Sequence, residues 1–265
     1  MVDEIRSGLL SLGLYSVGRT PSSALLQLIK KLRPQDCGIE LIRIGGTRDG
    51  GYLIPDDLEG IEYCFSPGVN TTSDFEEELA NRGIRSLMAD YSVEGPPIRR
   101  REFCFDKKFI GASDRDCFMT FETWKNKYIR DYTGDLILQM DIEGSEYEVL
   151  FNIPDPLLNQ FRVMAIEFHE LDRLFDPFTF SIYSACFEKI LQYFHVVHLH
   201  PNNGWGAVKA GDIEIPKYME FTFLNKRRVS SIRAQTTFPH KLDIDNTPKR
   251  TMLLPRCWYA TELSH

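Results

Sequence analysis

From residue 61 onwards, short apolar runs of strand length alternate with stretches whose apolar residues recur at helical spacing. Seven runs are predicted to be strands, and they cover residues 61–66, 84–90, 102–105, 136–141, 163–167, 194–200 and 218–224. Helices are predicted at residues 73–82, 121–130, 145–151 and 180–193. This alternation predicts an α/β fold with a mostly parallel sheet that is covered by helices on both faces.

Two parts of the pattern lie outside this alternation. The last two predicted strands are joined only by a loop, 201–216, so the final strand is expected to run antiparallel. Residues 1–33 read as helical and are expected to cap the sheet within one domain, with 1–58 forming the cap and glycine-rich loop and 59–265 the main body. Ser73 followed by Glu76 predicts a capping box, and 236–265 reads as an irregular tail that wraps the sheet.

Composition narrows the class of protein. The 265 residues are 43% hydrophobic and 26% charged, which suits one large globular domain, and the net charge of -7 argues against nucleic acid as the main partner. The six cysteines form no Cys-x-x-Cys pair and are read as free thiols of a reducing compartment. Without a signal-peptide pattern or an apolar run of about 18 residues, the protein is expected to be cytoplasmic and without a membrane span. A homodimer stays open.

Candidate chemistry is concentrated where the predicted strands end. The apolar run 136–140 stops at Asp141, and Glu143 and Glu146 follow at once. Ligands of open α/β sheets bind outside the carboxyl ends of the strands, although acids in a first helical turn also stabilise a helix without any catalytic role. His169 and His200 follow two other predicted strands, so these side chains converge on one crevice if the strands are parallel neighbours.

A nucleoside site is predicted at the first strand turn. Ser66, Pro67 and Gly68 end the first strand, and Asp90 ends the second about twenty residues later, which is the spacing of a ribose-binding acid in Rossmann-like folds. The helix that follows the first turn begins with the acids of residues 74–78, which repel a pyrophosphate. S-adenosylmethionine has a ribose, no phosphate and a positive sulfonium, so it suits this site better than a dinucleotide.

The motifs resemble the FkbM-type (Methyltransf_21) family of S-adenosylmethionine-dependent O-methyltransferases. The matching stretches span most of residues 43–225, and they are 46–52 (GTRDGGY), 66–69 (SPGV), 141–150 (DIEGSEYEVL), 166–169 (IEFH), 198–203 (HLHPNN) and 215–220 (IPKYME). The resemblance implies a Rossmann-like class I methyltransferase fold with a seven-stranded sheet, and methylation of a hydroxyl of a sugar or glycan precursor. The first-strand loop departs from the family pattern because only Gly68 remains of the usual run of glycines.

The expected site residues follow from these observations. Cofactor contacts are expected from residues in the glycine-rich loop and at the strand ends, namely Asp49, Gly51, Tyr52, Ser66, Pro67, Gly68, Asp90 and Asp141. The catalytic residues are expected to be Asp141, Glu143, His169 and His200. Asp141, His169 and His200 together suit a divalent metal such as Mg²⁺, Mn²⁺ or Zn²⁺, and the alternative is that His169 alone is the general base.

The small-molecule or glycan acceptor is expected to contact aromatic rings and amides. Stacking is predicted for Trp124, Trp205, Phe175 and Tyr218, and hydrogen bonds to hydroxyls for Asn202 and Asn203, with core and loop packing as the alternative role. Two other functions stay open at this point. A nucleotide-sugar-dependent glycosyltransferase also uses acids near a metal, and a catalytically silent binding module keeps the same fold.

Overall fold

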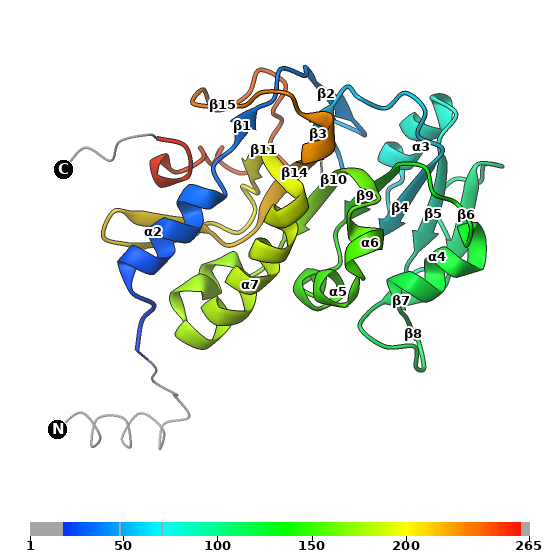
Figure 1. The fold of residues 1–265 in the computed structure, drawn as a ribbon, viewed down its shortest axis with the longest axis horizontal. Coiled ribbons are helices and arrows are strands. Elements are labelled where there is room, and N and C mark those ends of the chain that lie inside the picture. The colour runs from blue at the N-terminus through cyan, green and yellow to red at the C-terminus, as the bar shows by residue number, and fades with distance from the viewer. Residues whose placement is uncertain (1–17, 48, 70, 261–265) are drawn as a thin grey trace.

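A seven-stranded sheet forms the centre of the computed structural model, which describes residues 18–47, 49–69 and 71–260 (Figure 1). The strand order is β11-β14-β10-β9-β4-β5-β6, and β14 alone runs antiparallel to its neighbours. The strands are β4 (Tyr63–Pro67), β5 (Arg85–Ala89), β6 (Phe103–Asp106), β9 (Leu136–Met140), β10 (Phe161–Phe168), β11 (Phe194–Pro201) and β14 (Met219–Asn225). All seven predicted strands are therefore confirmed, and the last one is antiparallel as predicted.

The central strands are apolar because helices or a hairpin cover both of their faces. Every residue of β9 is buried, and alternate residues enter different layers: Leu138 packs in one core cluster and Ile137 in the other. Since successive side chains of a strand point to opposite faces, a strand that is buried on both sides must be apolar throughout. Gln139 is the polar exception on β9, and it faces a buried hydrogen-bonded network described below.

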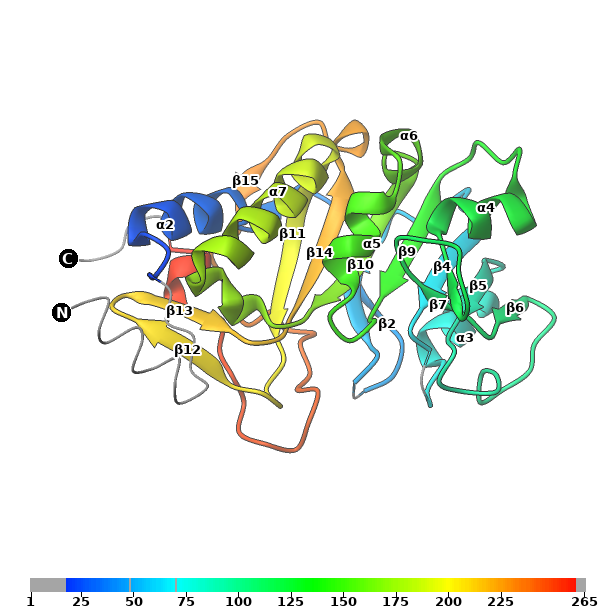
Figure 2. The same cartoon turned by 90° about the horizontal axis from the view of Figure 1, so that it is seen from below.

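The covering elements form two outer layers (Figure 2). On one face lie the helices α2 (Ser22–Lys31), α4 (Phe121–Ile129), α5 (Glu146–Asn152), α6 (Asp155–Leu158) and α7 (Pro177–Tyr193). The other face carries α3 (Asp74–Asn81) and the hairpin of β2 (Leu41–Ile44) and β3 (Tyr52–Pro55). The four predicted helices are confirmed, but α7 begins three residues early because Asp176 accepts the Thr179 N–H and Pro177 fits the first helical turn.

Short elements were not predicted from the apolar pattern. The loop between β11 and β14 contains a hairpin of β12 (Ala207–Ala210) and β13 (Ile213–Pro216), whose turn places Gly211 at φ 63°. The other small elements are β1 (Gln35–Asp36), β7 (Phe109–Ile110), β8 (Phe118–Met119), β15 (Arg233–Ala234), η1 (Leu171–Phe175), η2 (Lys226–Arg228) and η3 (Arg256–Trp258). Strands this short contain too few residues for an alternating pattern to be recognised.

The predicted capping box at α3 is wrong. Ser73 precedes the helix but its side chain makes no capping hydrogen bond, and Glu76 is buried. The Glu76 carboxyl contacts the hydroxyl of Ser66, which also donates to Oε1 of Gln139 at 2.7 Å. A carboxyl that turns inward to this buried network is unable to reach back to the backbone N–H of Ser73, as a capping box requires.

The first and last described elements, α2 and η3, pack against each other at the β11 side of the molecule (Figure 1). The helix α2 contributes Leu25, Leu28 and Ile29 to the core and lies beside η3, so the predicted helical cap is confirmed for the described part of residues 1–33. Residues 1–17 of that prediction lie outside the described residues. The tail is irregular apart from η3, as predicted, up to residue 260. None of the described helices combines the length and apolar character needed to cross a bilayer.

Candidate functional site

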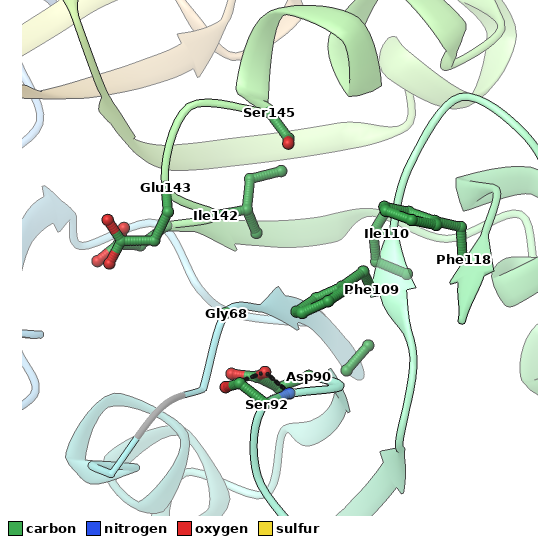
Figure 3. A pocket seen from close by; sticks show the side chains of 11 residues that line it. Gly68, Asp90, Ser92, Phe109, Ile110, Phe118, Ile142, Glu143 and Ser145 are labelled. Atoms are coloured by element: carbon green, nitrogen blue, oxygen red, sulfur yellow. Dashed lines mark hydrogen bonds between the residues drawn. The ribbon is translucent and has the colours of Figure 1, made fainter. Parts of the chain in front are cut away.

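A cavity of about 410 Å³ opens at the carboxyl ends of β4, β5 and β9 (Figure 3). This is the point where the strand order reverses direction, because β5 and β9 leave β4 on opposite sides. Apolar side chains of Phe109, Ile110 and Phe118 lie on one side of the cavity and Glu143 on the other. No lysine or arginine is among the described residues that line it.

Gly68 is required where β4 and β9 come together. Its φ of 90° is in the region that favours glycine, and a Cβ there would overlap the carbonyl oxygen of Asp141. The amide of Gly68 donates to Ala89 at 3.0 Å, so this residue links the ends of three neighbouring strands. The sequence placed Gly68 in the cofactor site, and the structure places it in the cavity lining.

Asp90 lies at the end of β5 with its carboxylate beside the cavity. Its Oδ1 accepts hydrogen bonds from the N–H of Ser92 at 2.7 Å and from the Ser92 hydroxyl at 2.6 Å (Figure 3). These bonds fix the loop after the strand and the direction of the carboxylate. Rossmann-like sheets place a ribose-binding acid at this strand end, so the position of Asp90 fits its predicted role.

The glycine-rich loop lies apart from the cavity lining. Gly51 has no room for a Cβ because Gly46 and the Arg43 side chain are too close, and the amide of Gly45 donates to Glu78 of α3 at 2.9 Å. Tyr52 is buried and its hydroxyl accepts from Gln139 at 3.3 Å. Of the predicted cofactor residues, the cavity lining includes Gly68, Asp90 and Asp141 and leaves out Asp49, Gly51, Tyr52, Ser66 and Pro67.

A carboxylate cluster surrounds His169 next to the cavity. Its Nε2 lies 3.6 Å from Asp141 and 3.5 Å from Glu143, and the third neighbour, Glu167, is 4.0 Å away. The imidazole is buried, whereas the Glu143 side chain is 78% exposed. The structure therefore brings together three of the four predicted catalytic residues, Asp141, Glu143 and His169.

Glu146 holds both His169 and the loop that carries Glu143. This fully buried carboxylate lies 2.9 Å from Nδ1 of His169 and accepts the N–H groups of Ile142 and Gly144, each at 3.1 Å. A carboxylate can only accept, so Nδ1 carries the proton and Nε2 of a neutral ring keeps its lone pair. Although burial alone lowers the pKa of His169, the bond to Glu146 and the nearby carboxylates raise it overall.

The carboxyl groups around His169 are buried close together, and this destabilises their charged forms. Burial, opposed by the charge of His169 and reinforced by the charges of Glu143 and Glu146, raises the pKa of Asp141 to about 7. Burial also raises the pKa of Glu167 well above its usual value, and the charge of Asp141 adds to this. Ligand atoms of Asp141, Glu167 and His169 lie within 4.8 Å of one another, and Oδ1 of Asp141 is buried with no hydrogen-bond partner among the described residues. These donors suit a divalent cation.

The structure separates His200 from this cluster, so the predicted metal set of Asp141, His169 and His200 needs correction. β14 lies between β10 and β11, and Glu220 on β14 is opposite both Glu167 and His200. At the usual strand spacing His200 is thus about 10 Å from Glu167. Its Nδ1 instead lies 3.7 Å from Asp243 of the tail. The prediction assumed that β10 and β11 are neighbours, and the returning last strand prevents this.

Asp243 attaches the tail to β11, and its replacement by asparagine is expected to lower the free energy of unfolding at pH 7 by about 1–3 kcal/mol. Its Oδ1 lies 2.8 Å from Nε2 of His198, and its Oδ2 accepts the N–H of His240 at 2.7 Å. Burial raises the pKa of Asp243, but the bonds from His198 and His200 outweigh this and hold it well below the usual value.

A depressed pKa in the folded state stabilises the protein above the unfolded aspartate value, which is about 4, and the stabilisation is lost as the pH falls below it. The deficit of Asp243→Asn is therefore expected to persist from pH 7 to about pH 4 and then to shrink. Urea unfolding at several pH values measures it, with Asp212→Asn in the exposed β12–β13 turn as the control. Equal stability of variant and wild type at pH 7 would contradict this role.

Two members of the cluster, Glu146 and Glu167, were not assigned a role from the sequence. Glu167 is two residues before His169, so both side chains point to the same face of β10, and this spacing was the available signal. Glu146 begins α5, where an acid is equally explained by the helix dipole. The predicted acceptor residues also change, because Trp124 is fully buried in the core.

The two predicted asparagines have other partners. Asn202 donates to Glu167 at 2.7 Å, and Asn203 donates to the carbonyls of Thr247 and Lys249 at 2.9 and 3.0 Å. Their amide groups therefore brace the acid cluster and the tail, which is the packing role that the sequence left open.

The strand order and the single antiparallel strand define a Rossmann-like class I methyltransferase fold. No protein-family model matches the chain, and no curated protein matches it. A solved structure of a fibrillarin/Nop5p complex is similar with a TM-score of 0.37 and 13% identity, over 63% of this chain and 74% of that chain. A putative DNA modification methyltransferase encoded within a prophage (E. coli) is similar with a TM-score of 0.44 and 11% identity, over 69% of this chain and 52% of that chain.

Proposed function

We propose that this protein is an S-adenosylmethionine-dependent O-methyltransferase of the FkbM type, and that its acceptor is a hydroxyl of a sugar or glycan precursor. The observation that carries the proposal is the cavity at the sheet's switch point, where Asp90 and Gly68 meet an apolar wall and His169 lies just beyond. The apolar side chains suit an adenine, and Asp90 suits the two ribose hydroxyls. The acids at Asp141 and Glu143 suit a positive sulfonium.

The charge of the site disfavours the competing enzyme class. A nucleotide-sugar-dependent glycosyltransferase needs positive charge or a metal that faces a diphosphate, whereas the described cavity lining has acids and no basic side chain. A silent binding module has no need for buried carboxylates around an imidazole, because their desolvation destabilises the fold. Both observations support an enzyme that transfers a methyl group.

The chemistry divides between the cofactor and the chain. When bound, S-adenosylmethionine would supply a sulfonium methyl group to the acceptor oxygen, and its sulfur would keep the electron pair of the broken bond. Nε2 of His169 would take the proton of the acceptor hydroxyl. Glu146 holds the ring with Nδ1 protonated, which keeps Nε2 ready to accept. Asp141 and Glu167 lie near enough to stabilise the imidazolium that results.

A divalent cation at the same centre is the competing form of this proposal. Asp141, Glu167 and His169 would hold Mg²⁺, Mn²⁺ or Zn²⁺, and the cation would lower the pKa of a bound hydroxyl. Nε2 of His169 is unable to serve as ligand and base at once. The nitrogen is a metal ligand in one form of the proposal and a base in the other. Activity measured after removal of metal distinguishes the two forms.

Cofactor binding is the direct test of the proposed function. Isothermal titration of the protein with S-adenosylmethionine, S-adenosylhomocysteine, NAD and a UDP-sugar should give binding for the first two ligands alone. Release of S-adenosylhomocysteine in the presence of sugar acceptors then reports turnover. Binding of NAD or the UDP-sugar without S-adenosylmethionine would overturn the proposal. We expect a cytoplasmic location because all six cysteines are free thiols.

Asp141→Asn tests the cation through stability. At pH 8 in chelator, the variant is expected to melt about 2–4 °C above the wild type. The substitution removes one of several crowded negative charges, and the repulsion that it relieves destabilises the wild type by roughly 1 kcal/mol. If the centre holds a cation, Mn²⁺ should raise the melting temperature of the wild type and leave that of Asp141→Asn unchanged. Differential scanning fluorimetry measures both effects, with Asp131→Asn on the exposed surface as the control. A wild type that responds to none of Mg²⁺, Mn²⁺ and Zn²⁺ and is fully active in chelator would leave His169 as the base.

A further inference from the structure

We propose that Trp205 and Tyr218 form the binding platform for the acceptor, and that its ligand is a neutral glycoside whose apolar face stacks on Trp205. The inference rests on the proposed function and deepens it, because it names the surface that selects the acceptor. A sugar ring has one face of C–H groups, and an exposed indole offers it a flat apolar partner of similar size.

The rings form a continuous path from His169 to solvent. The Tyr218 ring lies 4.4 Å from the His169 ring between centroids, and the Trp205 ring lies 5.0 Å from Tyr218 at an interplanar angle of 35°. Trp205 is 58% exposed, whereas the other two tryptophans, Trp124 and Trp258, are fully buried. A ligand on Trp205 therefore lies one aromatic ring away from the proposed base.

Trp205 is held firmly although it faces water. The preceding residue, Gly204, donates its N–H to Asn202 at 2.8 Å and accepts from the Lys249 ammonium at 2.6 Å. The same ammonium lies 6.0 Å from the centre of the Trp205 ring. The loop thus connects β11 with the tail and with the β12–β13 hairpin, which extends from the sheet in Figure 2. A large apolar side chain that is braced in an exposed position is typical of a binding surface.

The acids at the inner end of the platform, near His169, favour a neutral, hydroxyl-rich ligand. Tyr218 contacts the His169 ring, and Nε2 of that ring lies 3.5 Å from Glu143, so the acid cluster borders the inner end of the platform. Carboxylates accept hydrogen bonds from hydroxyl groups and repel phosphates and carboxylates. A glycoside can stack on the aromatic ring and donate several hydroxyl groups to the carboxylates. Phenol can stack on the ring but has a single hydroxyl group to donate.

Binding can be observed without methyl transfer. Because Trp205 is the exposed one of three tryptophans, a ligand that covers it should change the intrinsic fluorescence and protect it from quenching by acrylamide. The probes are methyl glycosides of glucose, galactose, mannose and rhamnose, and phenol and catechol are the comparison. We expect a saturable change with at least one glycoside in the wild type. Saturation transfer NMR with Trp205→Ala should show loss of that glycoside's signal.

Kinetics then test the role in the reaction. With the glycoside that binds, Trp205→Ala is expected to raise the acceptor KM about tenfold, while kcat and the Kd for S-adenosylmethionine stay within twofold. Trp205→Phe keeps a flat ring and should recover most of the affinity. Phe178→Ala provides the matched control, because Phe178 is 74% exposed and lies on α7 outside the platform.

The two proposals fail in different ways. If S-adenosylmethionine does not bind the wild type, the proposed function is wrong, and the fluorescence and NMR measurements still decide the platform. If no glycoside binds, if only the phenols bind, or if Trp205→Ala binds the glycoside as the wild type does, the platform proposal is overturned even when the cofactor binds normally.

Discussion

Replacement of His169 by asparagine is expected to lower kcat by about 10²–10⁴-fold, the usual contribution of a general base. Asparagine places an amide N–H near the position of Nδ1, so it can keep the bond to Glu146, but it has nothing at the position of Nε2. The Kd for S-adenosylmethionine should change by less than about threefold, because His169 is not among the residues that line the cavity. Initial rates and calorimetry measure the two effects.

The matched control for this variant is His195→Ala. His195 is a half-buried histidine on β11. It belongs neither to the carboxylate cluster around His169 nor to the group formed by His198, His200 and Asp243. Thermal melting of both variants shows whether the fold is retained. Wild-type turnover in folded His169→Asn would eliminate His169 both as base and as metal ligand, and would leave the carboxylates to be tested next.

Replacement of Asp90 by alanine is expected to weaken binding of S-adenosylmethionine by about 10–150-fold, which corresponds to roughly 1.5–3 kcal/mol for charge-assisted hydrogen bonds. The variant also removes the acceptor that holds Ser92. Asp90→Asn separates these effects, because its amide oxygen can still accept from Ser92 while the charge is lost. We expect calorimetry to give Asp90→Asn an intermediate Kd.

Asp131→Ala is the control for the loss of a carboxylate, since Asp131 is exposed and lies at the opposite end of the sheet, before β9 begins. An unchanged Kd in Asp90→Ala would remove the ribose assignment, and with it the main support for S-adenosylmethionine as the cofactor. Weakened binding of S-adenosylmethionine and S-adenosylhomocysteine to the same extent is the expected pattern, because both have the ribose that Asp90 contacts.

The buried carboxylates around His169 favour a functional role for this site over a structural one. Glu146 and Glu167 are almost fully buried beside Asp141, and carboxylates so close together destabilise a folded protein unless a proton, an imidazole or a cation lies between them. The bonds from backbone N–H groups to Glu146 offset part of this cost. Such an arrangement is typical of a catalytic centre and is unusual in a structural ion pair.

Local sequence patterns determined the elements of the sheet and the positions of Gly68, Asp90 and Asp141 at the strand ends. Strands buried on both faces have to be apolar throughout, and the end of an apolar run is visible in the chain, so β9 and Asp141 were predicted together. The spacing from Gly68 to Asp90 likewise follows from one strand, one helix and the next strand. These predictions depend on neighbours in the chain, and a single sequence contains that information.

Only the tertiary structure decided which strand ends are neighbours. β14 pairs between β10 and β11, and this pairing moves His200 away from His169 and towards Asp243, a residue 43 positions later in the chain. The same applies to Glu146, which could have been an ordinary first-turn acid until α5 was placed against β10. Strand order and long-range pairing arise from the packing of distant segments, and no local periodicity encodes them.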